Sequence, residues 1–214
     1  ALSSAASDVY KRQCLKECKK GAIIVAKYYL WVIILLFILD IGSKQLMDHI
    51  LKTPGNSITI IPHFFSFTLV YNTGAAWGIF GGQTWLLVSM SVICGLAMLF
   101  FLIYKAPKLS KMPKIALSLM IPGAFGNLID RAFYEKGVID FLQFTFIDFP
   151  VFNMADSYLV IGIIILIIWY IIVEINDIKN KNEKNQSDKD TANLSSAKEK
   201  LLEKSENEDK TDDK

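Results

Sequence analysis

Four long apolar segments constrain this chain more than any other feature of its sequence. The first, Ile23 to Ile41, is interrupted only by Lys27 near its start and is closed by Asp40. The others are Thr84 to Tyr104, Ile115 to about Phe133, and Met154 to Ile175. At about 1.5 Å per residue, helices of this length cross most of a hydrocarbon core of about 30 Å. The sequence therefore predicts an α-helical integral membrane protein with four transmembrane helices.

Composition and charge exclude several classes of protein. A hydrophobic content of 52% is too high for an ordinary soluble domain. The net charge of +2 is nearly balanced and forms no basic face, so we expect no nucleic-acid partner. Cys14 and Cys18 lie among lysines and Cys94 lies in an apolar segment, while His49 and His63 are distant from the first two. This arrangement predicts neither a disulfide framework nor a metal site.

The two ends of the chain differ from its apolar middle. Residues 1–22 form a polar leader, in which Ser3 to Gln13 is similar to the translated read-through of a sequencing adapter and carries no weight for the fold. Residues 176–214 are rich in Lys, Glu, Asp, Asn and Ser, a composition typical of a charged, solvated tail that is either disordered or loosely helical. The membrane domain is therefore predicted to occupy residues 23–175.

The connection from Gln45 to Gly82 has the pattern of a small extramembrane structure. Pro54 and Gly55 indicate a turn, and apolar side chains alternate with others from Phe65 to Tyr71, which indicates a strand. The small and apolar residues at 72–80 suit a short interfacial or re-entrant element. We therefore expect a small β-like cradle with a flap at one face of the membrane.

The positions of the lysines indicate the orientation of the protein in the membrane. They lie before the first span, between the second and third, and after the fourth: Lys16, Lys19, Lys20 and Lys27; Lys105, Lys108, Lys111 and Lys114; Lys179, Lys181 and Lys184. Because cytoplasmic loops carry an excess of lysine and arginine, both termini are predicted to be cytoplasmic. The two other connections hold few cations, so the β-like cradle is predicted at the outer face.

Carboxylates between the third and fourth spans are the main candidates for function. They are Asp130, Asp140, Asp148 and Asp156. An ionised carboxylate within a bilayer costs about 2.5–3.5 kcal/mol by insertion scales, so acids at the edge of a span indicate function. Two chemistries remain open on this ground alone. The acids could carry out hydrolysis, or they could pass ions or protons in a non-enzymatic channel or transporter.

Four motifs occur in a fixed order along the spans. They are LDIGSK at Leu39 to Lys44, NTGAA at Asn72 to Ala76, GAFGNLIDR through VIDF at Gly123 to Phe141, and FNMADS at Phe152 to Ser157. Together they resemble the lipoprotein signal peptidase (signal peptidase II) family of bacteria, over about residues 23–175. Pro122, where the family usually has glycine, is a departure that predicts a kink just before Asn127.

The resemblance implies an aspartic protease of the bacterial cytoplasmic membrane, with its active site near the outer face. Such an enzyme removes signal peptides from diacylglyceryl-modified prolipoproteins, uses no cofactor or metal, and contacts membrane lipids; we expect a monomer. The resemblance implies that Asp140 and Asp156 are the catalytic pair. It implies substrate-binding or supporting roles for Asp40, Lys44, Asn72, Gly74, Asn127, Asp130, Arg131, Asn153 and Ala155.

The chemistry of peptide hydrolysis supports Asp140 and Asp156 as a catalytic pair independently of the resemblance. Hydrolysis of a peptide without a metal or a stronger nucleophile needs one group to accept a proton from water and another to donate one. Two adjacent carboxyls that share one proton can do both, because like charges so close do not both ionise easily. Asn127 and Asn153 could orient these carboxyls, or they could only cap helices and bridge spans.

The other acids have structural interpretations as well. Asp130 beside Arg131 predicts an ion pair or a helix-end contact, and Asp148 before Pro150 predicts a solvated turn. Asp40 and Lys44 have the spacing of an i, i+4 helical pair, which could be structural or could position substrate.

Overall fold

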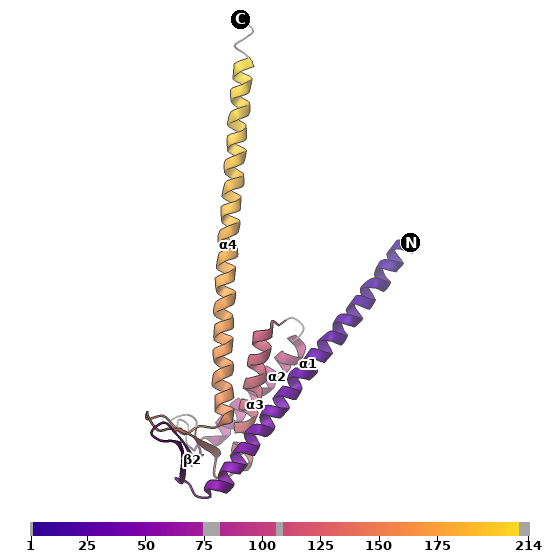
Figure 1. The fold of residues 1–214 in the computed structure, drawn as a ribbon. Helices are drawn as coiled ribbons and strands as arrows, with labels where there is room; N and C mark the ends of the chain where they lie inside the picture. The colour runs from indigo at the N-terminus through magenta and orange to yellow at the C-terminus, as the bar shows by residue number, and fades with distance from the viewer. Residues whose placement is uncertain (1, 75–81, 106–108, 210–214) are drawn as a thin grey trace. The chain divides into compact units, whose positions relative to one another are not determined.

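The computed structural model describes residues 2–74, 82–105 and 109–209, with side chains described for 27–74, 82–105, 109–186, 189 and 190. Its elements, in order, are α1 (Leu2–Leu51), β1 (Ser57–Ile61), β2 (Phe65–Asn72), α2 (Thr84–Lys105), α3 (Lys111–Phe133), β3 (Val138–Phe144) and α4 (Met154–Asp209) (Figure 1). Contacts divide the chain into two units, residues 1–167 and 168–214.

All four predicted spans are confirmed as helices. Their membrane-compatible parts are Lys27–Leu51, Thr84–Lys105, Lys111–Phe133 and Met154–Gln186. The third is the most enclosed, because α3 packs against both α1 and α2. The chain is therefore a multi-pass membrane protein with a small three-stranded sheet.

The first helix continues well past the predicted end at Ile41. It ends at Leu51, where Lys52 has a positive φ of 61° and Pro54 follows. Hydropathy locates only the apolar part of a helix, whereas a left-handed residue and a proline stop the backbone itself. Asp40 and Lys44 consequently lie within α1, one turn apart on the same face.

The last helix continues past the apolar span that was predicted to end at Ile175. The polar tail from residue 176 was predicted to be disordered or loosely helical, and α4 is helical to Asp209. Lys, Glu, Leu and Ala have high helix propensity, so this composition also suits a solvated helix. Lys179 Nζ lies 3.8 Å from Glu183 Oε1 in one exposed i, i+4 pair of this segment.

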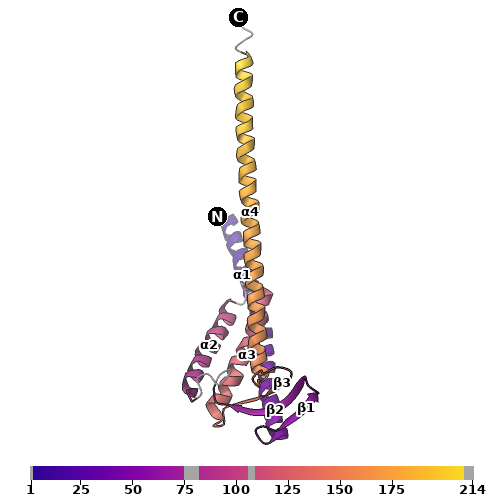
Figure 2. The same cartoon turned by 90° about the vertical axis from the view of Figure 1, so that its left-hand side faces the viewer.

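The sheet has the strand order β1-β2-β3 and is antiparallel throughout. The strand predicted from Phe65 to Tyr71 is confirmed as β2, which pairs with β3 so that Asn72 faces Val138 and Val70 faces Asp140. Figure 2 shows the sheet beside the end of α3 and the start of α4. The predicted re-entrant element at 72–80 lies mostly outside the described residues.

Two features fix the position of the third helix. Buried Ile33, Leu102, Leu117 and Ile121 form a core that joins α1, α2 and α3. Two glycines of α3 allow this helix to approach neighbouring elements closely. A Cβ on Gly123 would lie 2.6 Å from the Ala155 carbonyl oxygen, and one on Gly126 would lie 2.3 Å from Asp40 Oδ2. Side chains at these two positions would push apart the elements that carry the acidic residues.

Candidate active site

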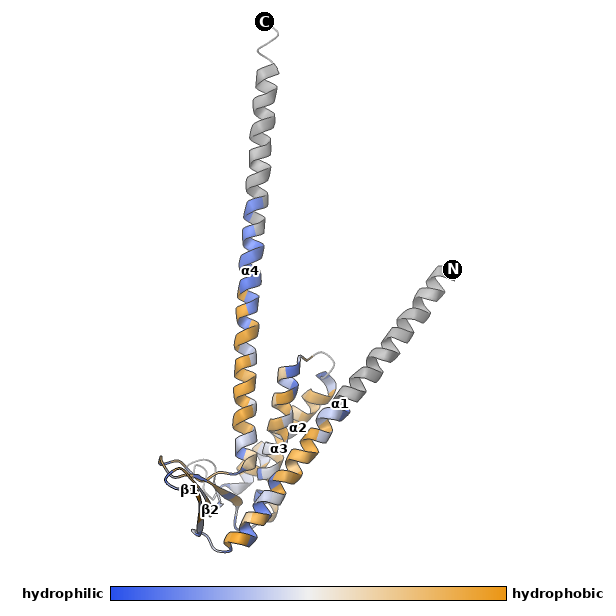
Figure 3. Cartoon of the chain, in the orientation of Figure 1, coloured by the Kyte–Doolittle hydropathy of each residue, from blue (hydrophilic) through white to orange (hydrophobic). Residues whose placement is uncertain are grey.

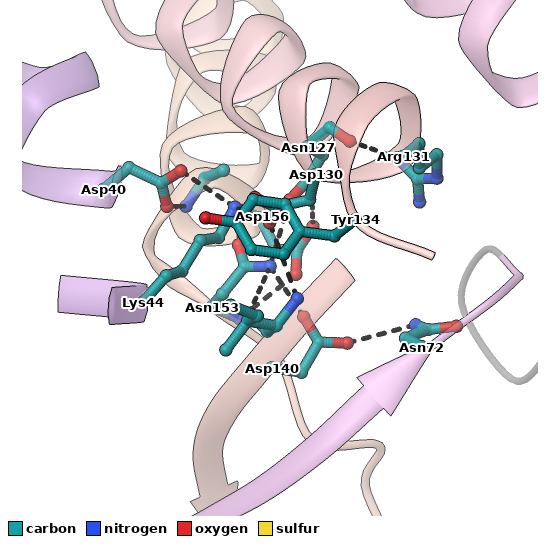
Figure 4. Close-up of polar contacts among 12 residues, drawn as sticks. Asp40, Lys44, Asn72, Asn127, Asp130, Arg131, Tyr134, Asp140, Asn153 and Asp156 are labelled. Atoms are coloured by element: carbon teal, nitrogen blue, oxygen red, sulfur yellow. Dashed lines mark hydrogen bonds and ion pairs between the residues drawn. The ribbon is translucent and has the colours of Figure 1, made fainter. Parts of the chain in front are cut away.

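Asp140 lies in β3 and is 2% exposed. Its Oδ2 accepts a hydrogen bond of 3.1 Å from Asn72 Nδ2, and its Oδ1 accepts one of 2.6 Å from Asn153 Nδ2 (Figure 4). Asn72 is the last residue of the neighbouring strand β2, so strand pairing itself brings this amide to the carboxyl. Both oxygens of Asp140 therefore have fixed donors.

Asp156 lies in the first turn of α4 and forms a reciprocal cap with Asn153. The Asn153 backbone N–H donates to Asp156 Oδ2 at 3.1 Å, and the Asp156 N–H donates to Asn153 Oδ1 at 3.0 Å. This is the capping-box arrangement, in which two backbone donors at a helix start are satisfied. Asn127 Nδ2 donates to the other oxygen, Asp156 Oδ1, at 2.7 Å.

The two carboxyls line the same cavity because the chain folds back between them. After the turn at 145–148, Phe152 pairs with Leu142: its N–H donates to the Leu142 carbonyl at 3.0 Å and its carbonyl accepts from the Leu142 N–H at 2.7 Å. Asn153 follows and contacts both acids with its own backbone and side-chain groups. The two carboxyls line one cavity of about 320 Å³.

Burial and charge change the acidity of Asp140. Its desolvation in the protein and, next, the nearby carboxylate of Asp156 raise the pKa of Asp140 to about 7. Hydrogen bonds from Asn72 and Asn153 oppose this increase in the pKa, because they stabilise the ionised form. Asp140 therefore retains a proton up to near-neutral pH.

A buried ionic cluster supports the site from α1. Lys44 Nζ lies 2.8 Å from Asp40 Oδ2, 2.9 Å from Asp130 Oδ2 and 3.0 Å from Asn127 Oδ1. Three oxygen atoms, two of them from carboxylates, thus surround the buried ammonium group within 3.0 Å. Asp40 Oδ1 accepts in turn from the Ala155 backbone N–H at 2.8 Å. The cluster joins α1, α3 and α4, and it contacts the Asn127 amide that donates to Asp156.

Asp130 forms a structural ion pair, one of its two predicted roles, but its partner is Lys44 of another helix and not Arg131 beside it in sequence. Consecutive helical residues point in directions about 100° apart, so they do not face each other. Arg131 instead donates through Nη2 to the Gly74 carbonyl at 3.1 Å and, more weakly, through Nη1 to the Asn127 carbonyl at 3.4 Å.

Gly74 and Asn72 form the turn that Arg131 holds. The Gly74 N–H donates to Asn72 Oδ1 at 2.9 Å, an Asx-type turn that begins where β2 ends. Arg131, on α3, therefore fixes the same turn that supplies the Asn72 amide to Asp140. Every residue expected at the site lies in this network of contacts.

Asp148 lies exposed in the turn before Pro150, as predicted. The apolar wall of the cavity was not identified from the sequence; it contains Val138, Phe149, Val151, Phe152, Leu159 and Val160. Phenylalanine recurs in the sequence at 144, 146, 149 and 152, but this pattern does not tell that Phe149 and Phe152 line the cavity whereas Phe144 contacts both of them. In the described residues, no three His, Cys, Asp or Glu side chains are arranged to hold a metal ion.

Comparisons with known proteins agree with this architecture. Lipoprotein signal peptidases of Staphylococcus aureus strains MRSA252 and JH9 are 36% identical over 163 residues, which cover 74% of this chain and 96% of each relative. Two solved structures, described as a bacterial membrane enzyme by the in meso method at 2.3 and 1.9 Å resolution, are 34% identical, with TM-scores of 0.62 and 0.60. These alignments cover 68% and 67% of this chain and 88% and 92% of the two structures.

The family model described as signal peptidase (SPase) II matches residues 32–172. This range contains the three transmembrane helices α2, α3 and α4 up to residue 172, most of the apolar part of α1, and the whole sheet. It also contains both carboxyls of the cavity and every side chain in the network around them. The chain therefore belongs to the signal peptidase II family of proteases.

Proposed function

We propose that this chain is an aspartic endopeptidase that removes signal peptides from diacylglyceryl-modified prolipoproteins. One observation carries the proposal: Asn153 contacts both Asp140 and Asp156, so two carboxyls line one cavity in a membrane protease. The names of the relatives supply the class of substrate. The same acids fit a channel or transporter less well, because Asp140 lies among fixed donors beside an apolar cavity.

The reaction divides between the two carboxyls. Asp156 accepts a proton from water as the water oxygen attacks the scissile carbonyl carbon, while Asp140 donates its proton to the carbonyl oxygen. When the tetrahedral intermediate collapses, the C–N bond breaks and Asp156 gives its proton to the departing amine. Asp140 recovers its proton as the carbonyl re-forms. The raised pKa of Asp140 supports its assignment as the initial acid.

The surrounding polar residues position this pair. Asn72 and Asn153 hold the Asp140 carboxyl, and Asn127 holds Asp156. Lys44, which Asp40 and Asp130 hold, donates to Asn127, while the Ala155 N–H fixes Asp40. Arg131 and Gly74 fix the turn beside the cavity. Preorganised donors of this kind contribute to catalysis because they do not have to reorient during the reaction.

The substrate is expected to approach from the membrane. A signal peptide is an apolar helix, and burial of lipid chains contributes about 0.8 kcal/mol per methylene, which holds a diacylglyceryl cysteine at the interface. The apolar wall formed by Phe149, Val151 and Leu159 gives such a substrate a compatible surface beside the acids. We place the cavity near the outer face of the bacterial cytoplasmic membrane, with both termini cytoplasmic, because the lysines lie at the opposite ends of the spans. We expect the peptidase domain to occupy residues 23–175 and the protein to be a monomer.

Cleavage of a lipid-modified precursor tests the proposed function. Purified protein in detergent is incubated with a diacylglyceryl-modified prolipoprotein, and intact mass measures the product. We expect a single cut immediately before the modified cysteine, and little cleavage of a precursor whose cysteine is replaced by serine. No cleavage of the modified precursor, together with ion flux in proteoliposomes, would favour a channel or transporter instead.

The pH dependence of cleavage tests the role of Asp140. Since burial raises the pKa of Asp140 to about 7, its carboxyl is protonated below that pH and loses its proton as the pH rises through it. If Asp140 supplies the first proton, kcat/KM is expected to fall about tenfold per pH unit above about pH 7. Stopped assays between pH 5 and 9 measure this alkaline limb.

Asn72→Ala is the matched variant for this profile. The Asn72 amide stabilises ionised Asp140, so its removal is expected to raise the pKa of Asp140 further and to move the alkaline limb to higher pH. A limb that stays in place, or that moves to lower pH, would contradict the assignment of the limb to Asp140.

A further inference from the structure

A second cavity lies between α1, α2 and α3, away from the catalytic residues. It has a volume of about 280 Å³, and all the residues that line it are apolar. Its floor includes buried Ile33 and Ile121 of the helix core. Leu30, Leu99 and Phe125 also line it. We call this cavity the three-helix groove.

The three-helix groove opens toward the membrane rather than into the protein. Ile34 on its rim is 46% exposed, whereas Ile121 on its floor is 1% exposed. Because these helices span the bilayer, the surroundings of the rim are hydrocarbon. A groove lined only by carbon in such surroundings takes an acyl chain, since no polar group of a peptide would find a partner there.

Helical periodicity places two lysines in line with the groove. Lys27 precedes Leu30 by three residues and Ile34 by seven, which puts all three on one face of α1. Lys114 likewise precedes Ile121 by seven residues on α3. The two cations therefore lie on the same helix faces as the groove and toward the same end of it.

The depth of the groove matches one leaflet. At 1.5 Å per residue, Leu30 lies about 4.5 Å and Phe37 about 15 Å beyond Lys27 along α1. Half of a hydrocarbon core of about 30 Å is also about 15 Å. The groove therefore spans the acyl region of the leaflet whose headgroups are level with Lys27 and Lys114.

The charge at this end is positive and unopposed in the described part of these helices. Residues 27–39, 84–105 and 109–125 contain no Asp or Glu. Among the described side chains, no carboxylate lies within ion-pair distance of Lys27 or Lys114. Figure 3 shows hydrophilic residues where α3 begins and hydrophobic residues along its body. Lysines in this position extend their ammonium groups to the headgroup region.

We propose that the three-helix groove binds an anionic phospholipid, with one acyl chain in the groove and the phosphate on Lys27 and Lys114. Basic sites between transmembrane helices bind anionic headgroups for the same electrostatic reason. Neutral phospholipids offer the same chains without the net negative charge, so charge decides between them. The site is separate from the cavity that contains Asp140 and Asp156.

Native mass spectrometry of the full chain in detergent tests the proposal. The protein is titrated with phosphatidylglycerol and with phosphatidylcholine of identical acyl chains. We expect phosphatidylglycerol to bind at least about fivefold more tightly. Lys114→Gln is expected to weaken phosphatidylglycerol binding about fivefold, the equivalent of about 1 kcal/mol for one lysine near a lipid headgroup.

Lys105→Gln is the matched control, because it removes one lysine from the same end of the bundle but off the face of α2 that carries Leu99. We expect it to weaken binding by less than about twofold. Leu99→Trp, which fills the groove, is expected to weaken the binding of both phospholipids. Equal affinity for the two phospholipids, equal effects of the two lysine variants, or no effect of Leu99→Trp would each overturn the proposal.

Discussion

Replacing either Asp140 or Asp156 by asparagine is expected to reduce cleavage of a diacylglyceryl-modified prolipoprotein by about 10²–10⁴-fold, the usual contribution of a general acid or base. Asparagine keeps the size of the side chain and the hydrogen-bond acceptor, but it neither donates an acidic proton nor accepts one from water. Single-turnover assays with purified variants measure the loss of rate directly. Since the proposed acid and base act in one step, the double variant should be little slower than either single variant.

Asp148→Asn is the matched control. Asp148 lies between the same two spans but is exposed in a turn, so its replacement should leave the rate within about twofold. Thermal unfolding of all variants shows whether they remain folded. Substantial cleavage by both Asp140→Asn and Asp156→Asn, or a loss in Asp148→Asn as large as theirs, would be incompatible with the proposed pair.

Lys44→Met is expected to destabilise the protein by about 3–5 kcal/mol, the usual effect of removing one partner from a buried ionic pair. Lys44 is 0% exposed, and its loss would leave Asp40 and Asp130 buried without their shared cation. For a chain of this size, such a change lowers the unfolding midpoint by about 6–20 °C. Thermal unfolding in detergent, followed by circular dichroism, measures the shift.

Lys179→Met is the control for this prediction, because Lys179 also forms an i, i+4 pair but is exposed. Its ammonium lies 3.8 Å from Glu183, with both side chains more than half exposed, so removal should cost at most about 1 kcal/mol. Adding Asp40→Asn to Lys44→Met should recover part of the lost stability, because one of the two unpaired carboxylates is then neutral. Similar midpoints for Lys44→Met and Lys179→Met would contradict the structural role of the cluster.

The helix ends show where sequence reasoning succeeds and where it stops. Thr84 and Met154 begin helices where hydropathy placed them, because the apolar run and the helix start together there. Leu51 was not predicted as the end of α1, because that end depends on the backbone of Lys52 and not on hydropathy. The sequence left residues 176–209 open between disorder and a loose helix, since polar composition alone is compatible with either, and the structure has them helical.

The candidate site shows the same division between local and long-range information. The motifs singled out Asp140, Asp156 and their neighbours, because residue type and order along the chain are enough for a family resemblance. The apolar wall of the cavity, including Phe149 and Val151, was not identified because cavity walls are assembled from segments whose contacts no local pattern encodes.

The sequence by itself determined the four spans, the strand β2 and the membrane class, and it singled out Asp140 and Asp156 as candidates, because hydropathy, alternation and motif order are properties of the linear chain. Only the tertiary structure decided which charges pair. Lys44 joins Asp130 across two helices, while Arg131 turns away to Gly74, because neighbours on a helix point in different directions and their partners come from other elements. The fold-back at Phe152, which brings Asn153 to both Asp140 and Asp156, likewise depends on a long-range backbone pairing.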